Sequence, residues 1–260
     1  MMSDSLIFEQ PLNEKCRLLL RIAHLFDQLD FHLPQPDTWH ARAAIQTLLD
    51  IAHVLARSDI KSDLLKEIQR YQLTLERIVH NPKVDNHLLQ HVLQDLHHTH
   101  DSLINQPGKL GDSLRNDEFL QSIQQRKPIP GGASDVDLPQ LQAWLHQPHA
   151  ERLLYLDDWC NDVMVVREAV DLLLRMIRNS TTFTSVQATD GRFQHRCHRD
   201  MWVHMVRIAL PAQPGIFAEI SGGQHRFSIR FMQSIDWQQT VPITQDIEFE
   251  LNICSVSTLV

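Results

Sequence analysis

The sequence predicts an α+β fold in which an N-terminal antiparallel helical bundle over residues 11–180 precedes a smaller C-terminal antiparallel β domain over residues 181–260. Up to about residue 180, apolar residues recur every three or four positions, which is the spacing of one helix face. Beyond that point polar and apolar residues alternate, as they do along strands with one buried side. A run of helices followed by a run of strands is typical of α+β proteins. Residues 5–10 are a candidate for one further strand of the sheet.

Prolines and capping residues divide the helical region. The first predicted helix begins at Pro11, where a first helical residue needs no N–H donor, and ends before Pro34. Asp37 or Thr38 is expected to cap the second helix, because its side-chain oxygen can accept a bond from a free N–H group of the first turn. Short connections between helices favour antiparallel packing. The remaining helices are expected over residues 64–78, 89–103, 114–123, 138–146, 150–160 and 163–178.

The segments after residue 180 predict an antiparallel sheet. Residues 202–208 are rich in β-forming side chains, and residues 246–253 alternate between polar and apolar. Residues 216–220 and 225–232 are predicted to form a hairpin, because the Ser-Gly-Gly-Gln segment at 221–224 favours a turn.

The chain is acidic, with 24 Lys and Arg residues against 32 Asp and Glu residues and a net charge of −8. Such a charge disfavours general nucleic-acid binding, which depends on neutralising phosphates. The charge is unevenly distributed, because residues 181–235 contain six arginines and three acids, whereas residues 236–260 contain four acids and no Lys or Arg. The β region is therefore expected to carry a local positive patch.

Cysteine content and hydropathy indicate the compartment. The four cysteines are far apart and form no CxxC pair, which suits a reducing environment. The sequence contains no window of about 18 apolar residues, so no membrane span is predicted. The first residues lack the basic stretch and apolar run of a secretory signal. We therefore expect a cytoplasmic protein.

Arg226 and Arg230 are the leading candidates for a binding site. In a strand they share one face with Ser228. Guanidinium groups are planar and permanently charged, so this pair can bind carboxylates of another molecule. The alternative is structural, because Glu248 and Glu250 also share a strand face and could pair with the two arginines in a cross-strand ladder.

A histidine-rich helix raises the possibility of a metal site. His87 and His91 are four residues apart, Asp95 continues the stripe, and more histidines follow at residues 97–100. A metal-dependent enzyme using residues 87–100 is therefore the alternative function. A solvated helix face explains the same pattern, since no distant third ligand is apparent. The phosphate-loop, dinucleotide-binding and nucleophile-elbow motifs are absent, so no motif points to a catalytic residue, a metal or a cofactor.

Several blocks spread over residues 7–232 together indicate a family. They are Ile7–Lys15 with Arg17 and Leu20-Arg21-Ile22; Leu64-Leu65-Lys66-Glu67; Leu114-Arg115 with Asp117; Pro130-Gly131-Gly132 with Asp137-Leu138-Pro139, Leu141 and Trp144-Leu145-His146; and Arg226-Phe227 with Ile229-Arg230-Phe231-Met232. In this order and spacing the blocks resemble the Z-ring-associated protein D (ZapD) family. No single block is a mechanistic signature, so the resemblance depends on their joint order.

The resemblance implies a cytoplasmic, non-enzymatic bacterial division factor that acts at the mid-cell division site. Members of this family are homodimers that bind the C-terminal tail of the tubulin-like GTPase FtsZ and cross-link its protofilaments into bundles. The expected partners are therefore FtsZ and a second copy of the chain, without nucleic acid or membrane insertion. Trp144 is a candidate for holding apolar tail residues, with a place in the helix core as the alternative. Carried over by motif, the basic tail-binding pocket consists of Arg115, His146, Arg226, Arg230, Arg57 and Arg21.

Overall fold

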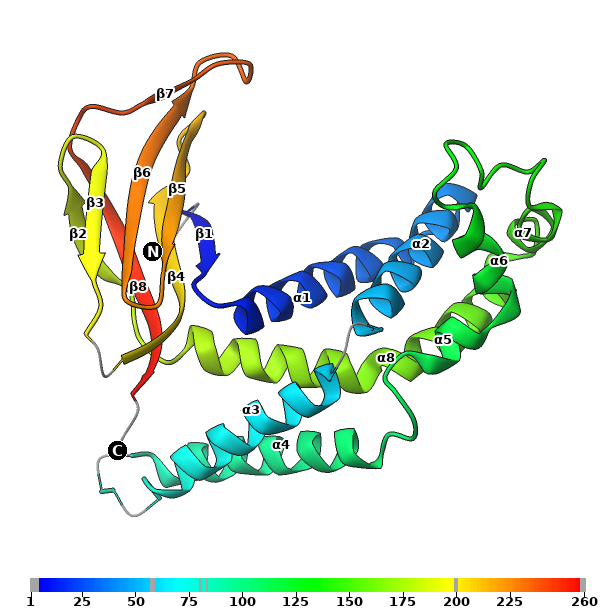
Figure 1. Ribbon diagram of the computed structural model, residues 1–260, viewed down its shortest axis with the longest axis horizontal. Helices are drawn as coiled ribbons and strands as arrows, with labels where there is room; N and C mark the ends of the chain where they lie inside the picture. Colours follow the sequence, from blue (N-terminus) through cyan, green and yellow to red (C-terminus); the bar gives the residue numbers. More distant parts are fainter. Residues whose placement is uncertain (1–4, 57–58, 80, 83, 199–200, 258–260) are drawn as a thin grey trace. The chain divides into compact units, whose positions relative to one another are not determined.

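The molecule contains two units, here called the β unit and the helical unit. The β unit comprises residues 1–20 and 174–260, and the helical unit comprises residues 21–173. The strands belong to the β unit, and most helices precede most strands along the chain, so the predicted α+β class is confirmed (Figure 1). The structure is a computed structural model that describes residues 5–56, 59–79, 81–82, 84–198 and 201–257.

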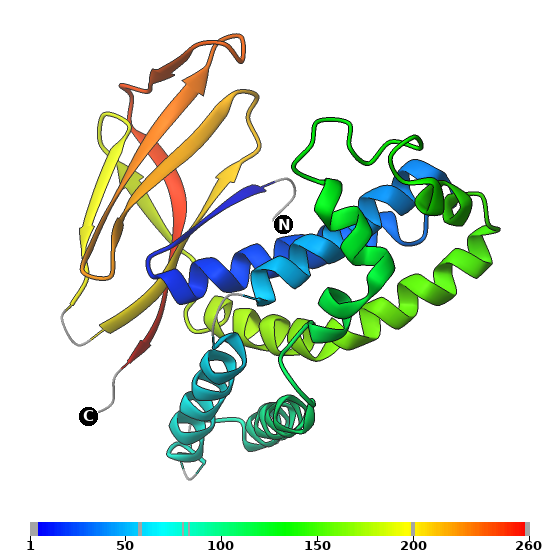
Figure 2. The same cartoon turned by 45° about the vertical axis from the view of Figure 1, so that its right-hand side comes forward.

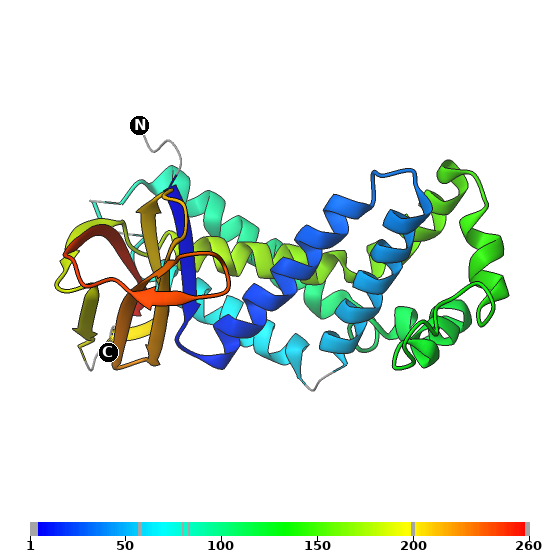
Figure 3. The ribbon, with the colours of Figure 1, turned by 90° about the horizontal axis from the view of Figure 1, so that it is seen from above.

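The helices of the described residues follow one another along the chain, with connections that range from one residue between α5 and α6 to residues 127–138 between α6 and α7. α1 and α2 are antiparallel neighbours, and α3 packs alongside α4 (Figures 1 and 3). Asp37 caps α2 as predicted, because its side chain accepts bonds from two N–H groups of the first turn. α1 and α8 each continue from one unit into the other. The helices are α1 (Glu14–His32), α2 (Thr38–Leu55), α3 (Ile60–Glu76), α4 (Asn86–Asn105), α5 (Asp112–Asn116), α6 (Glu118–Arg126), α7 (Pro139–Leu145) and α8 (His149–Arg178).

The first helix begins later than predicted. Pro11 is the last residue of strand β1 (Ser5–Pro11), so its expected position at the start of the helix is wrong. The Asn13 side chain accepts a hydrogen bond from the backbone N–H of Cys16 at 2.8 Å. This bond satisfies a donor of the first turn, so that α1 begins at Glu14.

Two other helix boundaries also differ from the prediction. α8 is one helix of 30 residues, so the separate helices expected over residues 150–160 and 163–178 are continuous. Residues 161–162 contain neither Gly nor Pro, and burial on both sides of them favours continuation of the helix. The helix expected over residues 114–123 is instead divided into α5 and α6 at Asp117, whose side chain accepts the N–H of Leu120 at 2.8 Å.

The strands form two antiparallel sheets (Figure 2). One sheet has the order β1-β4-β8-β2, and the other has the order β3-β6-β5, with β7 also paired to β6. The predicted strand over residues 5–10 is confirmed as β1, and the predicted hairpin is confirmed as β5 and β6. The remaining strands are β2 (Thr184–Ala188), β3 (Arg192–Arg196), β4 (Met201–Pro211), β5 (Ile216–Gly223), β6 (Arg226–Ser234), β7 (Thr240–Pro242) and β8 (Ile247–Ser257).

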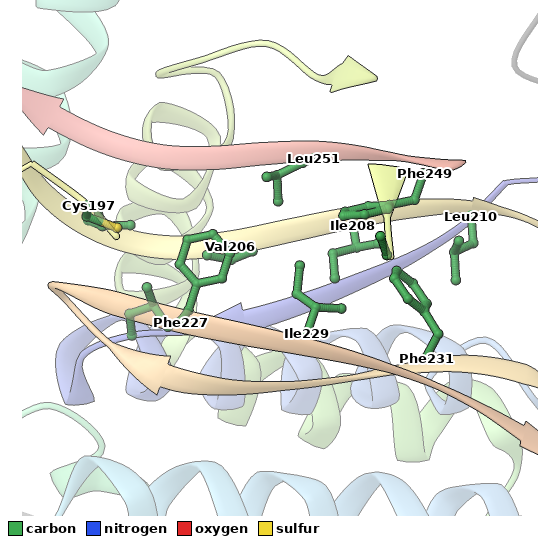
Figure 4. Packing of buried hydrophobic residues seen from close by; sticks show 12 residues of the cluster. Cys197, Val206, Ile208, Leu210, Phe227, Ile229, Phe231, Phe249 and Leu251 are labelled. Atoms are coloured by element: carbon green, nitrogen blue, oxygen red, sulfur yellow. The ribbon is translucent and has the colours of Figure 1, made fainter. Parts of the chain in front are cut away.

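The two sheets face each other across an apolar core (Figure 4). The rings of Phe231 from β6 and Phe249 from β8 lie 5.0 Å apart between their centres. Side chains that alternate along each strand supply this core, so the intervening positions of β6 face outward. The core residues labelled in Figure 4 are Cys197, Val206, Ile208, Leu210, Phe227, Ile229, Phe231, Phe249 and Leu251.

A tight turn between β2 and β3 fixes the position of β3. Gly191 has a φ of +67°, and a Cβ atom at this residue would lie 2.0 Å from the carbonyl oxygen of Ile243. Its own carbonyl oxygen accepts a bond from the N–H of Phe231 at 2.9 Å. The close approach and the positive φ both require glycine, and together they hold the beginning of β3 against β6.

Candidate functional site

β6 presents Arg226 and Arg230 on the outer face of its sheet. Both residues are exposed, whereas Phe227, Ile229 and Phe231 between and beside them are almost fully buried. A shift of one residue in register would expose these three apolar side chains, so their burial fixes the face that the arginines occupy. The predicted arrangement of the two arginines on one strand face is therefore confirmed.

The neighbouring strand β3 adds two arginines that the sequence analysis did not select. The register places Arg192 opposite Arg230 and Arg196 opposite Arg226. All four arginines are exposed. Directly opposed residues on one sheet face have Cβ atoms about 4.5–5.5 Å apart. We call these four residues the arginine face.

On the other side of β6, strand β5 contributes a single acid. Glu219 lies opposite Arg230, and Gly223 lies opposite Arg226. Glu219 is the only acid on the outer face of β3, β5 and β6, all of whose residues the structure describes. One end of the arginine face therefore has an acidic neighbour, while the other end has none.

The alternative pairing of the β6 arginines with Glu248 and Glu250 is wrong. These acids belong to β8 in the other sheet, where they lie opposite Gln187 and Ser185 of β2. In the part of the chain that the structure describes, no acid forms an ion pair with the arginine face. Opposed like charges destabilise an antiparallel pair of strands. The arginine face therefore lowers the stability of the β unit, and Glu219 opposite Arg230 is the single acid on the outer face of β3, β5 and β6 that can offset part of the repulsion.

Arg115 differs from these arginines because its guanidinium group has internal partners. Its Nη2 atom forms an ion pair with Asp112, and its Nη1 atom donates to the carbonyl oxygens of Ala52 at 3.3 Å and Leu110 at 3.0 Å. The Arg115 guanidinium beside Asp112 also holds the pKa of that carboxyl below its usual value. These bonds connect α5 with α2 in the helical unit.

The remaining predicted site residues also belong to the helical unit. His146 is exposed directly after α7, and its Nδ1 atom donates to the carbonyl oxygen of Gln142 at 2.8 Å. This bond uses Nδ1 and leaves Nε2 for other partners. Arg21 is exposed on α1. Arg57 lies outside the residues that the structure describes.

Trp144 belongs to the core of the helical unit. Its side chain is buried, and its ring centre lies 5.8 Å from that of Phe119 and 6.0 Å from that of Trp159. The core alternative for this residue is therefore confirmed, and a direct contact with a bound tail would require the cluster to open.

The histidine-rich helix α4 does not gather a metal-ligand set. The Nδ1 atom of His91 lies 3.6 Å from a carboxylate oxygen of Asp95, and the His91 side chain is 68% exposed. His97 instead contacts the amide of Gln72 at 3.2 Å. Within the described ranges, no group of three or more His, Cys, Asp or Glu residues could hold a metal ion. This geometry favours a solvated helix face over the metal-enzyme alternative.

The cysteines provide no activated nucleophile. All four are buried free thiols. Burial raises the pKa of Cys16, Cys160 and Cys254 to about 12, and it also raises the pKa of Cys197. A nucleophilic cysteine requires the thiolate form, which these environments disfavour.

Known proteins match the chain over nearly its whole length. The family model for ZapD, described as a cell division protein, matches residues 20–230. The chain belongs to the ZapD family. A cell division protein ZapD from Nitrosomonas eutropha is 35% identical over 249 residues, which cover 96% of this chain and 99% of the relative. ZapD from Methylococcus capsulatus is 33% identical over 253 residues, covering 97% and 99%. ZapD from Coxiella burnetii is 32% identical over 258 residues, covering 98% and 100%.

Membership of the ZapD family confirms the resemblance found in the sequence and assigns the protein to cell division. Among the described helices, none has both the length and the apolar character needed to cross a membrane.

Proposed function

We propose that this ZapD family member is a non-enzymatic factor that binds the C-terminal tail of FtsZ and, as a homodimer, cross-links FtsZ protofilaments into bundles. The protein acts in the cytoplasm at the mid-cell division site, without a cofactor, nucleic acid or membrane insertion. Arg226 and Arg230 are the principal residues of the tail-binding site. We also propose that the tail contacts four residues of the helical unit, which are Arg115, His146, Arg57 and Arg21.

The observation that carries this proposal is that Arg226 and Arg230 are exposed and form no ion pair with an acid of the described residues. The chain has a net charge of −8, so acids are abundant elsewhere in the protein. Two unpaired guanidinium groups on one strand face can each bind a carboxylate through two parallel hydrogen bonds. An acidic tail is the kind of ligand that this arrangement favours.

Arg115 is expected to contribute less to tail binding than the β6 arginines. It would have to exchange its bonds with Asp112 and two backbone carbonyl groups for bonds with a ligand. The exchange yields a small net gain, because hydrogen bonds are lost as others form. An Arg115→Ala variant should therefore weaken tail binding less than an Arg226→Ala variant.

Bundling follows from linking two weak sites. An exposed ion pair contributes about 0.2–1 kcal/mol, so a single tail is expected to bind weakly and to dissociate at high salt. A C₂ dimer supplies two equivalent sites, and a protofilament presents many tails. Once one tail is bound, the second binding event is effectively intramolecular, which raises the overall affinity. No chemical step on the protofilament is needed.

Co-sedimentation with FtsZ tests the proposal. The wild-type chain should pellet with FtsZ protofilaments, whereas the Arg226→Glu/Arg230→Glu variant should not. A Lys66→Glu/Arg126→Glu variant makes the same change in net charge on exposed positions of α3 and α6, and it should still pellet. Unchanged pelleting of the β6 variant with normal circular dichroism would refute the site.

Two further measurements test the partner and the dimer. FtsZ without its C-terminal tail should not pellet with the wild-type chain, and equal pelleting would refute tail binding. Sedimentation equilibrium should give a dimer at micromolar concentrations. A strictly monomeric chain that still bundled FtsZ would refute cross-linking by two linked sites.

A further inference from the structure

We propose that β3 supplies the second half of the tail-binding surface, so that Arg192 and Arg196 bind the same acidic segment as Arg226 and Arg230. The segment lies along the strands in an extended conformation, with two acidic side chains about 13 Å apart, which is four residues at 3.3 Å each. This inference rests on the proposed function and extends its site from one strand to two.

The register of the two strands produces two rows of paired positive charge. Arg192 and Arg230 form one row, and Arg196 and Arg226 form the other. Each row places two guanidinium groups where they can bind the same carboxylate, which has room for several donors on its two oxygens. The two rows are four residues apart along both strands.

The surface between the rows is polar and uncharged. Gln194 of β3 lies opposite Ser228 of β6, which in turn lies opposite Ser221 of β5. The two serine Oγ atoms are 2.9 Å apart. These side chains can accommodate the backbone of an extended segment between its two acidic residues, and they add no charge that would repel it.

The position of β3 is held by the backbone and does not depend on its arginines. Gly191 approaches Ile243 too closely for any side chain, and its carbonyl oxygen accepts the N–H of Phe231. Arg192 also donates its backbone N–H to Thr189 at 2.9 Å. The four arginines are therefore held side by side despite their mutual repulsion. Binding of a ligand then requires no additional free energy to bring them together.

Glu219 makes the two rows unequal. It lies opposite Arg230 and so lowers the positive potential of the first row, whereas Gly223 opposite Arg226 adds no charge to the second. The row of Arg196 and Arg226 should therefore bind an acidic group more strongly. Removing the charge of Glu219 should strengthen binding at the other row.

The outer face favours an acidic peptide over a nucleic acid. Proteins that bind single strands combine positive charge with aromatic side chains on which bases stack. Between the two rows, the outward positions of β3 and β6 are occupied by Gln194 and Ser228, and neither is aromatic. The overall charge of −8 also opposes binding of a long polyanion.

Fluorescence anisotropy with the full-length chain tests this inference. The probes are two labelled nine-residue peptides of identical composition, with two aspartates either four or two positions apart, at about 50 mM salt, where screening is weak. The peptide with four-residue spacing should bind more tightly. The Arg192→Glu/Arg196→Glu variant should weaken its binding by about tenfold, as should Arg226→Glu/Arg230→Glu. The Glu219→Gln variant should strengthen binding by about threefold.

The outcomes separate this inference from the proposed function. Loss of binding in the β6 variant with unchanged binding in the β3 variant would overturn the inference and leave the proposed function intact. Unchanged binding in both variants would overturn both. Equal affinity for the two peptides would refute the extended orientation, and tighter binding of an oligothymidylate than of the peptide would refute the choice of an acidic peptide. Because Glu219→Gln removes no described bond, it remains informative if the β3 variant fails to fold.

Discussion

Replacement of Glu9 by glutamine would test the charge network that joins β1 to the rest of the β unit. The Glu9 carboxylate accepts bonds from Arg178 at 2.9 and 2.8 Å and from Arg207 at 2.8 Å. Glu9 and Arg207 also lie directly opposite each other in the β1–β4 pairing. Their side chains are only 18% and 14% exposed, so water can replace the lost contact only poorly.

The expected loss of stability follows from this burial. Removing one partner of a fully buried ion pair costs about 3–5 kcal/mol, because the other charge stays buried without a partner. The cost is lower here, because the Arg178 side chain is 37% exposed and can turn toward water. The Glu9→Gln variant should therefore lose about 2–3 kcal/mol of unfolding free energy at pH 7. For a unit of the size of the β unit, which comprises residues 1–20 and 174–260, that loss corresponds to a fall in Tm of about 10 °C.

The same network predicts a dependence on pH. Burial alone would raise the pKa of Glu9, but the hydrogen bonds and charges of Arg178 and Arg207 outweigh burial and lower the pKa below its usual value. A carboxyl group with a lowered pKa in the folded state contributes stability above its unfolded pKa and loses that contribution as the pH falls through the folded pKa. The difference between wild type and variant should be complete at pH 7 and should shrink below about pH 4.

Urea unfolding followed by circular dichroism measures this difference at each pH. Glu14→Gln is the matched control, because Glu14 is 78% exposed in its ion pair with Arg17. The control should change the unfolding free energy by less than about 0.5 kcal/mol. The reasoning would be refuted if Glu9→Gln behaved like the control at pH 7, or if the difference increased as the pH fell.

Three further predictions concern the arginine face, a helix cap and the thiols. Ser228→Glu places an acid between the two rows of the arginine face, so it should stabilise the β unit by about 1 kcal/mol in urea unfolding. The same variant should no longer pellet with FtsZ, and retained pelleting would contradict the proposed site. Asp117→Ala removes the cap of α6 and the acceptor for the Trp159 indole N–H, so the unfolding free energy measured by thermal unfolding should fall by about 2 kcal/mol. An unchanged unfolding free energy would contradict the assigned cap. At pH 8 the four buried thiols should react with a disulfide reagent only after denaturation, and rapid labelling of the folded chain would contradict their burial.

The sequence was most informative where the structural signal is local. Alternation together with a Ser-Gly-Gly-Gln turn was enough to predict the β5–β6 hairpin. The break expected near residues 161–162 was wrong, because polar residues without Gly or Pro can continue a helix that is packed on both sides. The start of α1 was misplaced because proline is suitable both for the end of an edge strand and for the first turn of a helix.

The assignment of strands to sheets could not be predicted in the same way. Alternation determines which residues share a face, but it does not determine which strand is the neighbour. Glu248 and Glu250 therefore matched the β6 arginines in pattern while belonging to the other sheet. Arg192 and Arg196 were not selected because the His- and Arg-rich segment around them has a single apolar residue, Phe193, over residues 192–196, although the turn-forming Asp190-Gly191 pair before it was a usable signal.

The β unit contains arginines of two kinds, and the difference between them supports the functional assignment. Arg178 and Arg207 share the Glu9 carboxylate, so their charges stabilise the fold. The four residues of the arginine face form no ion pair within the described chain, where only Arg230 has an acid, Glu219, opposite it, and their opposition across two strands costs stability. Selection for stability alone favours the first arrangement and removes the second. An unpaired cluster held in place by a tight backbone turn is therefore best explained by a ligand that supplies the missing negative charge, and the same substitutions that relieve the repulsion should abolish binding.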